Sequence, residues 1–414
     1  MCQQSLAIVS QPSSITMFLI QLIDSLLLFG ALLIAIPIIT FTVECLMALL
    51  PRKVSDKPVL QQRPSTAILI PAHNEAEQID LVVRGAKKQL LDGDRLITIA
   101  DHCQDNTAEL ARNAGATVIE RVNEINRGKG YALDAGLRYL AENEPPEIVV
   151  FLDADCLMAD NAIAHITCLA KEKGRPVQAK YLMEQPDDPS LKDRVSTFAL
   201  LVKNRVRFLG LNNLGGHCLL TGSGMAFPWS AMDRVSIVGA INADDMKLTV
   251  DLTLQDKVPT YCEEAFVIGR LMKDEDAQSQ RTRWEHGHLS MISVEVPRLL
   301  KAFFQKPSAD FLLLALDISV PPLSLLVMLW LVAIVISVLA VFTLGASFLP
   351  TMILAVSGVI LFVGVIAAWS KFGNQILPFK NLIAIPFYVL GKIPIYLKFI
   401  VKPQAGWLST ERDI

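Results

Sequence analysis

The sequence predicts an α/β domain with a mostly parallel sheet and helices on both of its faces, flanked in the chain by membrane-spanning helices. Three short, continuous apolar runs have the length and composition of buried strands: Thr66 to Pro71, Leu96 to Ala100 and Ile148 to Leu152. Helical stretches lie between these runs, and strands that alternate with helices are typical of a parallel sheet covered on both faces. The chain is 52% hydrophobic, and the excess is concentrated at its two ends, where apolar segments are long enough to cross a bilayer.

The first apolar segment extends from Ile15 to Leu50 and contains only two charged residues, Asp24 and Glu44. Both lie near its ends, where we expect their carboxylates to reach the headgroup layer. The run from Ser25 to Val43 is by itself long enough to span the hydrocarbon core. A cleaved signal peptide fits poorly, because residues 1–14 contain no Lys or Arg. Basic residues follow the segment directly, so the positive-inside rule predicts a cytoplasmic central domain.

Two segments near the other end, Leu323 to Leu344 and Met352 to Trp369, also have the length and composition of spanning helices. The link between them is short and uncharged, which predicts that it lies outside and that the C-terminus returns to the cytoplasm. The run from Phe311 to Pro322 is too short to span, so we expect it either to lie in the interface or to lengthen the next helix. From Asn381 to Val401 the chain is apolar but interrupted by lysines. We predict an amphipathic interfacial helix there, with a fourth span as the alternative.

The chain therefore divides into an N-terminal membrane helix (residues 1–51), a cytoplasmic domain (52–306) and C-terminal membrane and interfacial helices (307–414). The net charge of −3 does not indicate a nucleic-acid-binding protein. The seven cysteines form no CxxC pair, which favours a reduced compartment and argues against a disulfide framework or a zinc module. We interpret the segment from Val195 to Phe208, which carries three basic residues, as a surface helix near lipid headgroups.

Acidic residues follow the apolar runs, at the edge where parallel sheets bind their ligands. Asp153 and Asp155 come directly after the third run, and two carboxylates at that spacing suit a hard divalent cation. Asp101 follows the second run and is a candidate acceptor of hydrogen bonds from a base or a sugar. The sequence from Arg127 to Gly130 begins a helix, where Lys129 and the helix N-terminus supply positive charge for a phosphate. A solvated acidic loop and a plain helix start are the alternative interpretations.

Two later motifs complete the candidate site. Asp245 lies at the start of a predicted helix, where its carboxylate is a candidate base for an attacking hydroxyl, and a simple helix cap is the alternative. The sequence QRTRW, from Gln280 to Trp284, combines an indole and a guanidinium, which suit a sugar ring and a phosphate. An anchor at the membrane interface is the alternative. His286 and His288 are two residues apart and do not share a helix face, so they do not predict a metal site.

In their order along the chain, these motifs resemble those of the family 2, inverting, GT-A-fold glycosyltransferases. The resemblance is to the membrane group that contains the cellulose, chitin and hyaluronan synthases and bacterial exopolysaccharide transferases. It extends from Ser65 to about Trp284, and to the flanking membrane helices. The matching motifs are PAHNE with Pro71 and Glu75, ADHCQDNT with Asp101, RGKG with Lys129, DAD with Asp153 and Asp155, TGSG with Gly222, DD with Asp245, and QRTRW with Gln280, Arg283 and Trp284.

The resemblance implies a role for each of these residues. Donor-binding residues would be Pro71, Glu75, Asp101, Lys129, Asp153 and Asp155, and the last two would also hold Mg²⁺ or Mn²⁺. Asp245 would be the catalytic base, and Gly222, Gln280, Arg283 and Trp284 would line the acceptor and diphosphate end. The usual threonine-glutamate-aspartate before the base is Ala243-Asp244-Asp245 here, so we expect a different acceptor neighbourhood. The number of spans is smaller than in the cellulose synthases, which argues against a self-made translocation channel.

The predicted function is inverting transfer of a sugar from a nucleotide-diphosphate sugar, in the first place a UDP-sugar, to a growing polysaccharide or a lipid-linked acceptor. We expect a multi-pass protein of the bacterial inner membrane that works in exopolysaccharide or cell-envelope glycan synthesis, with a polysaccharide export system as a source of partners. The first alternative is transfer of a single sugar to polyprenyl phosphate or to a glycolipid. A non-catalytic membrane scaffold or transporter is the second, and the intact acidic set argues against it.

Overall fold

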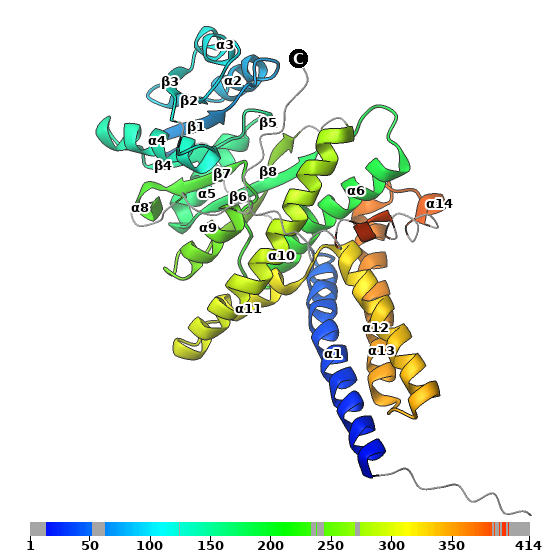
Figure 1. Ribbon diagram of the computed structural model, residues 1–414. Coiled ribbons are helices and arrows are strands. Elements are labelled where there is room, and N and C mark those ends of the chain that lie inside the picture. Colours follow the sequence, from blue (N-terminus) through cyan, green and yellow to red (C-terminus); the bar gives the residue numbers. More distant parts are fainter. Residues whose placement is uncertain are drawn as a thin grey trace, which may run out of the picture.

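The apolar runs predicted as strands belong to one eight-stranded sheet. The domain around this sheet lies at one end of a group of long helices (Figure 1). The computed structural model describes residues 14–51, 63–123, 125–232, 244–269 and 274–382. It also describes isolated positions outside these ranges (237, 385, 389, 391–394 and 396).

The sheet has the strand order β3-β2-β1-β4-β7-β6-β8-β5. Its strands are β1 (Thr66–Ala72), β2 (Arg95–Asp101), β3 (Thr117–Arg121), β4 (Ile148–Phe151), β5 (Cys156–Met158), β6 (Val177–Met183), β7 (Met225–Pro228) and β8 (Thr260–Gly269). The pairs β3–β2, β2–β1, β1–β4 and β6–β8 are parallel, whereas β4–β7, β7–β6 and β8–β5 are antiparallel. The predicted mixed, mostly parallel sheet is therefore confirmed.

Side chains of β1 alternate between two separate apolar cores, one on each face of the sheet. Ile68 and Ile70 pack in the core that also contains buried residues of α2 (Ile79–Lys87), α3 (Thr107–Ala114) and α5 (Ala162–Lys173). Ala67 and Leu69 pack in the opposite core, with α4 (Lys129–Glu142), α8 (Trp229–Met232) and α9 (Asp244–Thr253). Helices therefore cover both faces, as the alternation of strands and helices predicts.

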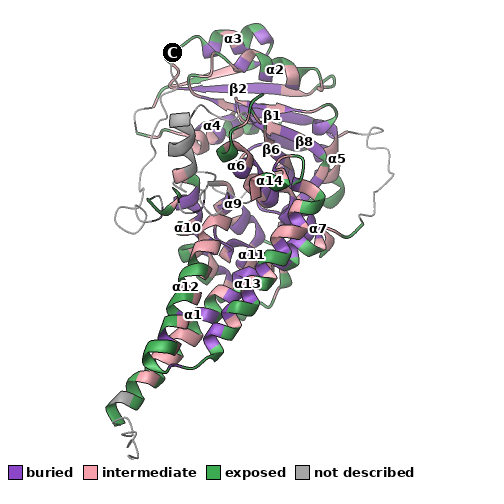
Figure 2. Cartoon of the chain, turned by 90° about the vertical axis from the view of Figure 1, so that its right-hand side faces the viewer, coloured by how far each residue is buried: buried purple, intermediate pink, exposed green. Residues whose placement is uncertain are grey.

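Three helices are long and apolar enough to cross a membrane. They are α1 (Ser14–Met47), α12 (Leu323–Leu344) and α13 (Leu349–Ala368), the last continued by the π-helix η2 (Trp369–Gly373). Large apolar side chains are exposed along all three, for example Phe29, Phe342 and Phe362, and Figure 2 shows the exposed positions. Lipid contact would cover such side chains. The three predicted spanning segments are thus continuous helices, and this suggests membrane association.

A third apolar core joins the sheet domain to the membrane helices. It contains buried residues of α1, α12 and α13, together with α6 (Leu191–Leu201), the π-helix η1 (Val202–Val206), α7 (Arg207–Asn213), α10 (Asp274–Gln305) and α11 (Ala309–Ser319). The prediction of a surface helix from Val195 to Phe208 is therefore wrong. Its apolar residues are buried in this core, and Arg207 is only 5% exposed. The basic residues suggested an exposed surface, but buried acidic partners neutralise Arg207.

Two further expectations about the membrane region are corrected by the structure. The run from Phe311 to Pro322 does not lengthen the next helix, because α11 ends at Ser319 and Pro321 and Pro322 separate it from α12. Glu44 does not reach the headgroup layer, because it is only 2% exposed and bonds to Arg207. Most of the predicted interfacial helix from Asn381 to Val401, and residues 1–13, lie outside the described residues.

Candidate active site

The loops that carry the acidic motifs leave the sheet along one edge. In the parallel register, Ala72 of β1 lies opposite Ala100 of β2, and Leu69 of β1 opposite Phe151 of β4. Pro71 lies within β1, close to this edge. Just beyond β1, the backbone N–H of Glu75 donates a 2.8 Å hydrogen bond to Thr107 Oγ1 and so fixes the PAHNE loop against α3.

Asp101, the last residue of β2, uses its carboxylate to hold neighbouring loops together. It is 5% exposed, and its Oδ1 lies 2.5 Å from Nη1 of Arg121. The backbone N–H of Gly128 donates a 3.3 Å hydrogen bond to Asp101 Oδ2, and His102 Nδ1 lies 3.1 Å from Oδ1. Asp101 thus joins the end of β2 to the RGKG motif that begins α4.

Lys129, the first residue of α4, reaches two other loops. Its Nζ forms an ion pair with Asp153, after β4, and donates a 2.7 Å hydrogen bond to the carbonyl oxygen of Gly222, before β7. A Cβ placed on Gly222 would lie 3.3 Å from Lys129 Nζ, 3.7 Å from Asp245 Oδ2 and 4.0 Å from Asp153 Oδ2. Three predicted site residues from separate parts of the chain therefore surround one glycine. The backbone φ of Gly222 is +90°, a value that residues with a Cβ rarely adopt.

These charged groups shift one another's pKa values. Burial raises the pKa of Asp153, Lys129 opposes that effect, and the carboxylates of Asp155 and Asp245 add to it, so that the net shift is upward. Burial alone would lower the pKa of Lys129, but Asp153 and Asp245 outweigh it and raise the pKa above its ordinary value. The site therefore carries more negative than positive side-chain charge, and this environment attracts a cation.

Asp153 and Asp155 fit the divalent cation that the sequence predicts. Their ligand atoms and the sulfur of Cys156 all lie within 4.8 Å of one another. Burial raises the pKa of the Cys156 thiol well above its usual range, so the thiol stays protonated and does not suit a hard cation. The two carboxylates supply the oxygen ligands that Mg²⁺ prefers in proteins.

The comparisons with known proteins agree with this geometry. The family described as Glycosyl transferase family 2 matches residues 67–219. This part of the chain is a family 2 glycosyl transferase domain. The chain is similar to 4,4'-diaponeurosporenoate glycosyltransferase from Staphylococcus aureus (strain bovine RF122 / ET3-1), with 33% identity over 94 residues. The enzyme of that name from strain N315 is 28% identical over 123 residues.

These alignments cover 22% and 28% of this chain, and only 24% and 32% of the relatives' own lengths. A solved structure described as mannosyltransferase PcManGT from Pyrobaculum calidifontis, in complex with GDP-Man and Mn²⁺, superposes with a TM-score of 0.53. It is 17% identical in sequence, and the match covers 85% of this chain and 97% of that chain. At this identity the similarity concerns the fold alone, and it agrees with the GT-A fold that the motifs imply.

Sequence reasoning missed two buried residues that position the Gly222 loop of the glycosyl transferase domain. Gln178, in β6, accepts a 2.9 Å hydrogen bond from the Thr221 N–H and donates one of 2.9 Å to the Ser223 carbonyl oxygen. Thr249, in α9, accepts a 2.9 Å bond from the Leu220 N–H and donates one of 3.0 Å to the carbonyl oxygen of Asp245. A glutamine inside the otherwise apolar start of β6 was the signal that could have identified Gln178.

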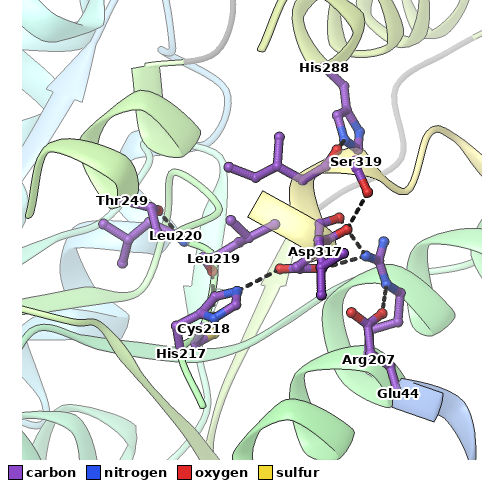
Figure 3. A network of polar contacts seen from close by, with 12 residues as sticks. Glu44, Arg207, His217, Cys218, Leu219, Leu220, Thr249, His288, Asp317 and Ser319 are labelled. Atoms are coloured by element: carbon purple, nitrogen blue, oxygen red, sulfur yellow. Dashed lines mark hydrogen bonds and ion pairs between the residues drawn. The ribbon is translucent and has the colours of Figure 1, made fainter. Parts of the chain in front are cut away.

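A buried polar network connects this loop of the domain to α1 (Figure 3). Arg207 Nε lies 2.5 Å from Glu44 Oε2, and the same guanidinium forms an ion pair with Asp317 of α11. His217 Nε2, at the start of the loop segment, lies 2.9 Å from Asp317 Oδ2. Burial would raise the pKa of Asp317, but Arg207 and His217 hold it below its ordinary value. The carboxylate therefore stays charged and ties the loop to the junction with the membrane helices.

The QRTRW motif lies within α10. Trp284 is 38% exposed and lines a cavity of about 240 Å³ where the glycosyl transferase domain meets α12 and α13. The Arg283 side chain is partly exposed, and the side chain of Gln280 lies outside the described residues. The structure thus brings Lys129, Asp153, Asp155, Gly222 and Asp245 together, and it places Trp284 in the lining of the cavity at the junction with α12 and α13.

Proposed function

We propose that the protein transfers a sugar from a nucleotide-diphosphate sugar to an acceptor hydroxyl at a membrane, with inversion at the anomeric carbon. The observation that carries this proposal is the convergence of Lys129, Asp153 and Asp245 around Gly222. It supplies a cation, a candidate metal ligand and a candidate base within one small volume. The family 2 domain over residues 67–219 supports the same reaction class.

Donor binding would use the acidic sheet edge, including Glu75 and Asp101. Asp153 and Asp155 would hold Mg²⁺ or Mn²⁺, which when bound neutralises charge on a diphosphate leaving group. Lys129 supplies a second positive charge at the same place, because its ammonium lies between Asp153 and the carbonyl oxygen of Gly222. A cation fixed before the reaction begins stabilises the departing diphosphate without reorganising.

Asp245 would act as the general base. Its carboxylate lies at the start of α9, and Thr249 one turn later fixes the backbone of Asp245 against the loop that contains Gly222. In the transfer step the carboxylate takes the proton of the acceptor hydroxyl while that oxygen attacks the anomeric carbon. The bond from that carbon to the nucleotide diphosphate breaks on the opposite face, and this inverts the configuration.

Several finer assignments belong to the same proposal. The catalytic domain would be residues 52–306, on the cytoplasmic side of a bacterial inner membrane. The donor would be a UDP-sugar in the first place. The acceptor would be a growing polysaccharide or a lipid-linked acceptor, with transfer of one sugar to a lipid as the alternative.

A panel of nucleotide sugars tests the reaction class. Purified protein in nanodiscs with a bacterial lipid extract is incubated with UDP-glucose, UDP-N-acetylglucosamine and GDP-mannose, and nucleotide release is measured together with the anomeric configuration of the product. We expect release with one donor, an inverted product, and loss of transfer in Asp245→Asn.

The control is Asp256→Asn, which changes an exposed carboxylate that pairs only with the surface residue Lys306 among the described residues. It should transfer like the unmodified protein. A retained configuration, or normal transfer by Asp245→Asn, would refute the proposed mechanism.

A further inference from the structure

We propose that the cavity lined by Trp284 binds the acceptor, and that this acceptor is an amphiphile whose apolar chain ends in an oxyanion held by Lys203. The inference rests on the proposed transfer reaction, since it names the acceptor class for the same site. It assigns a binding role to a lysine outside all of the motifs.

The cavity is apolar and lies at the junction with the membrane helices. Its lining includes Phe41 of α1, Phe198 of α6, Val327 of α12 and Val365 of α13. Its volume of about 240 Å³ is below the range of roughly 300–1,000 Å³ typical of pockets that enclose a whole small ligand. A site of this size and position suits one end of a long apolar molecule whose remainder stays in the bilayer.

Lys203 lines this cavity from η1. No ion pair or hydrogen bond connects its ammonium to any residue within the described ranges. Burial lowers its pKa, and the carboxylate of Asp245 is the main influence that opposes this shift. Lys203 is partly exposed, and an ammonium partly withdrawn from water gains from a counter-ion, so this lysine suits an anion that arrives with the ligand.

The other charged groups of the lining already have partners. Arg207 binds Glu44 and Asp317, and Lys392 pairs with Glu285. His288 Nε2 lies 3.0 Å from the carbonyl oxygen of Ile318, and burial lowers the pKa of this imidazole to about 3, so that it is neutral. A ligand anion would therefore find its counter-ion in Lys203.

The position of Lys203 also connects the cavity to the reaction centre. Val202, next to Lys203, and Met246, next to Asp245, are buried in the same apolar core. The Asp245 carboxylate opposes the downward shift of the Lys203 pKa and contributes to the upward shift of the Lys129 pKa. Lys129 belongs to the donor side and Lys203 to the cavity. A head group bound to Lys203 would thus lie beside the proposed base. A phosphate monoester, whose second pKa is about 6, keeps one proton on a fraction of its molecules near pH 7. Asp245 would take that proton while Lys203 holds a negative oxygen, whereas a carboxylate has no such proton.

Binding of three probes with the same chain tests this assignment. Dodecyl phosphate, dodecanoate and dodecanol are titrated into the full-length protein in nanodiscs, and binding is followed by native mass spectrometry. We expect at least one anionic probe to bind more tightly than the alcohol. Tighter binding of dodecyl phosphate identifies a phosphate head group, and tighter binding of dodecanoate identifies a carboxylate.

Lys203→Met keeps the length and apolar stem of the side chain but removes its charge. It should weaken binding of the preferred anion by about ten- to hundredfold and leave the alcohol unchanged. The control Lys301→Met changes an exposed lysine of α10 and should have no effect. Val327→Phe narrows the cavity and should weaken all three probes, which tests the site even if Lys203→Met misfolds.

Equal binding of the anions by Lys203→Met and the unmodified protein, or no preference for an anion over the alcohol, would overturn the assignment. Acceptor-independent hydrolysis of the nucleotide sugar is measured on the unmodified protein and on the control Lys301→Met, and it reports on the proposed reaction without requiring the acceptor. If no donor is hydrolysed or transferred while an anion still binds through Lys203, the proposed function fails and the binding site stands.

Discussion

Replacing Gly222 by alanine perturbs the centre of the candidate active site by a single methyl group. Its Cβ would lie 3.3 Å from Lys129 Nζ, closer than most such contacts, and the φ of +90° adds backbone strain. For a residue with a Cβ this strain is about 1–2 kcal/mol. Displacing the Lys129 ammonium would remove its hydrogen bond to the Gly222 carbonyl oxygen. A hydrogen bond with a charged donor contributes about 1.5–3 kcal/mol. If this contribution is present in the transition state, transfer should slow by about tenfold to 150-fold.

Gly93 provides a matched control, because its φ is +89° and no atom lies within 4 Å of the position its Cβ would take. Both variants should lose the stability that the strained φ costs, and Gly222→Ala should lose somewhat more because it also displaces Lys129, whereas only Gly222→Ala should lose transfer. The assay is nucleotide release from the preferred donor by purified protein, normalised to the folded fraction. The reasoning is refuted if Gly222→Ala slows release no more than Gly93→Ala does.

Four other predictions concern the metal, the acceptor side, the membrane junction and pH. Asp155→Asn should abolish transfer. EDTA should abolish transfer by the unmodified protein, and added Mg²⁺ or Mn²⁺ should restore it. Activity that survives both the substitution and the chelator would contradict the metal assignment. Trp284→Ala should slow transfer by roughly thirtyfold or more through lost burial and orientation while donor affinity, measured by calorimetry, stays unchanged. Gly210→Ala would bring a Cβ to 1.9 Å from the carbonyl oxygen of Glu44, so α7 must move away from α1, and a loss of at least about 1–3 kcal/mol is expected in thermal unfolding. Gly30→Ala, where no atom lies within 4 Å, is its control and should not destabilise the protein. Burial lowers the pKa of His288 to about 3, so its stabilising contribution is complete above the unfolded pKa of about 6.5 and is lost as pH falls towards 3. When the pH falls from 7 to 5, the free energy of unfolding should decrease by about 2 kcal/mol less in His288→Gln than in the unmodified protein. If both proteins lose the same amount, the pKa of His288 is not lowered by folding.

The sequence was most informative where structure is set by neighbouring residues. The strands β1, β2 and β4 are continuous apolar runs, and their polar continuations at Asp101 and Asp153 follow from the common direction of parallel strands. The strands β6, β7 and β8 were not predicted, because they pair over long separations in the chain, β4–β7 and β7–β6 in antiparallel and β6–β8 in parallel. The meeting of Lys129 with Gly222, 93 residues later, likewise depends on how the whole sheet is ordered.

The errors have a physical cause that local sequence does not reveal. Arg207 and Glu44 each suggested an exposed position, and each is buried because the other neutralises it from 163 residues away. Lys203 was predicted to lie on a surface helix near lipid headgroups, because a lysine is normally a solvated surface residue. Only the packing of η1 against the membrane helices places the Lys203 ammonium in the lining of an apolar cavity.

The contacts of α1 have a consequence for the order in which the chain is made. Glu44 bonds to Arg207, 163 residues later, and Thr42 Oγ1 donates to the carbonyl oxygen of Ile360, 318 residues later. At a synthesis rate of about 5–20 residues per second, roughly 8–33 s separate Glu44 from its partner and roughly 16–64 s separate Thr42 from Ile360. During this interval α1 has neither of these partners, and its acidic side chain has not yet met its arginine. The ribosome therefore completes the sheet domain before α13 exists, and the final packing of α1 against α13 waits for the last of the three long apolar helices.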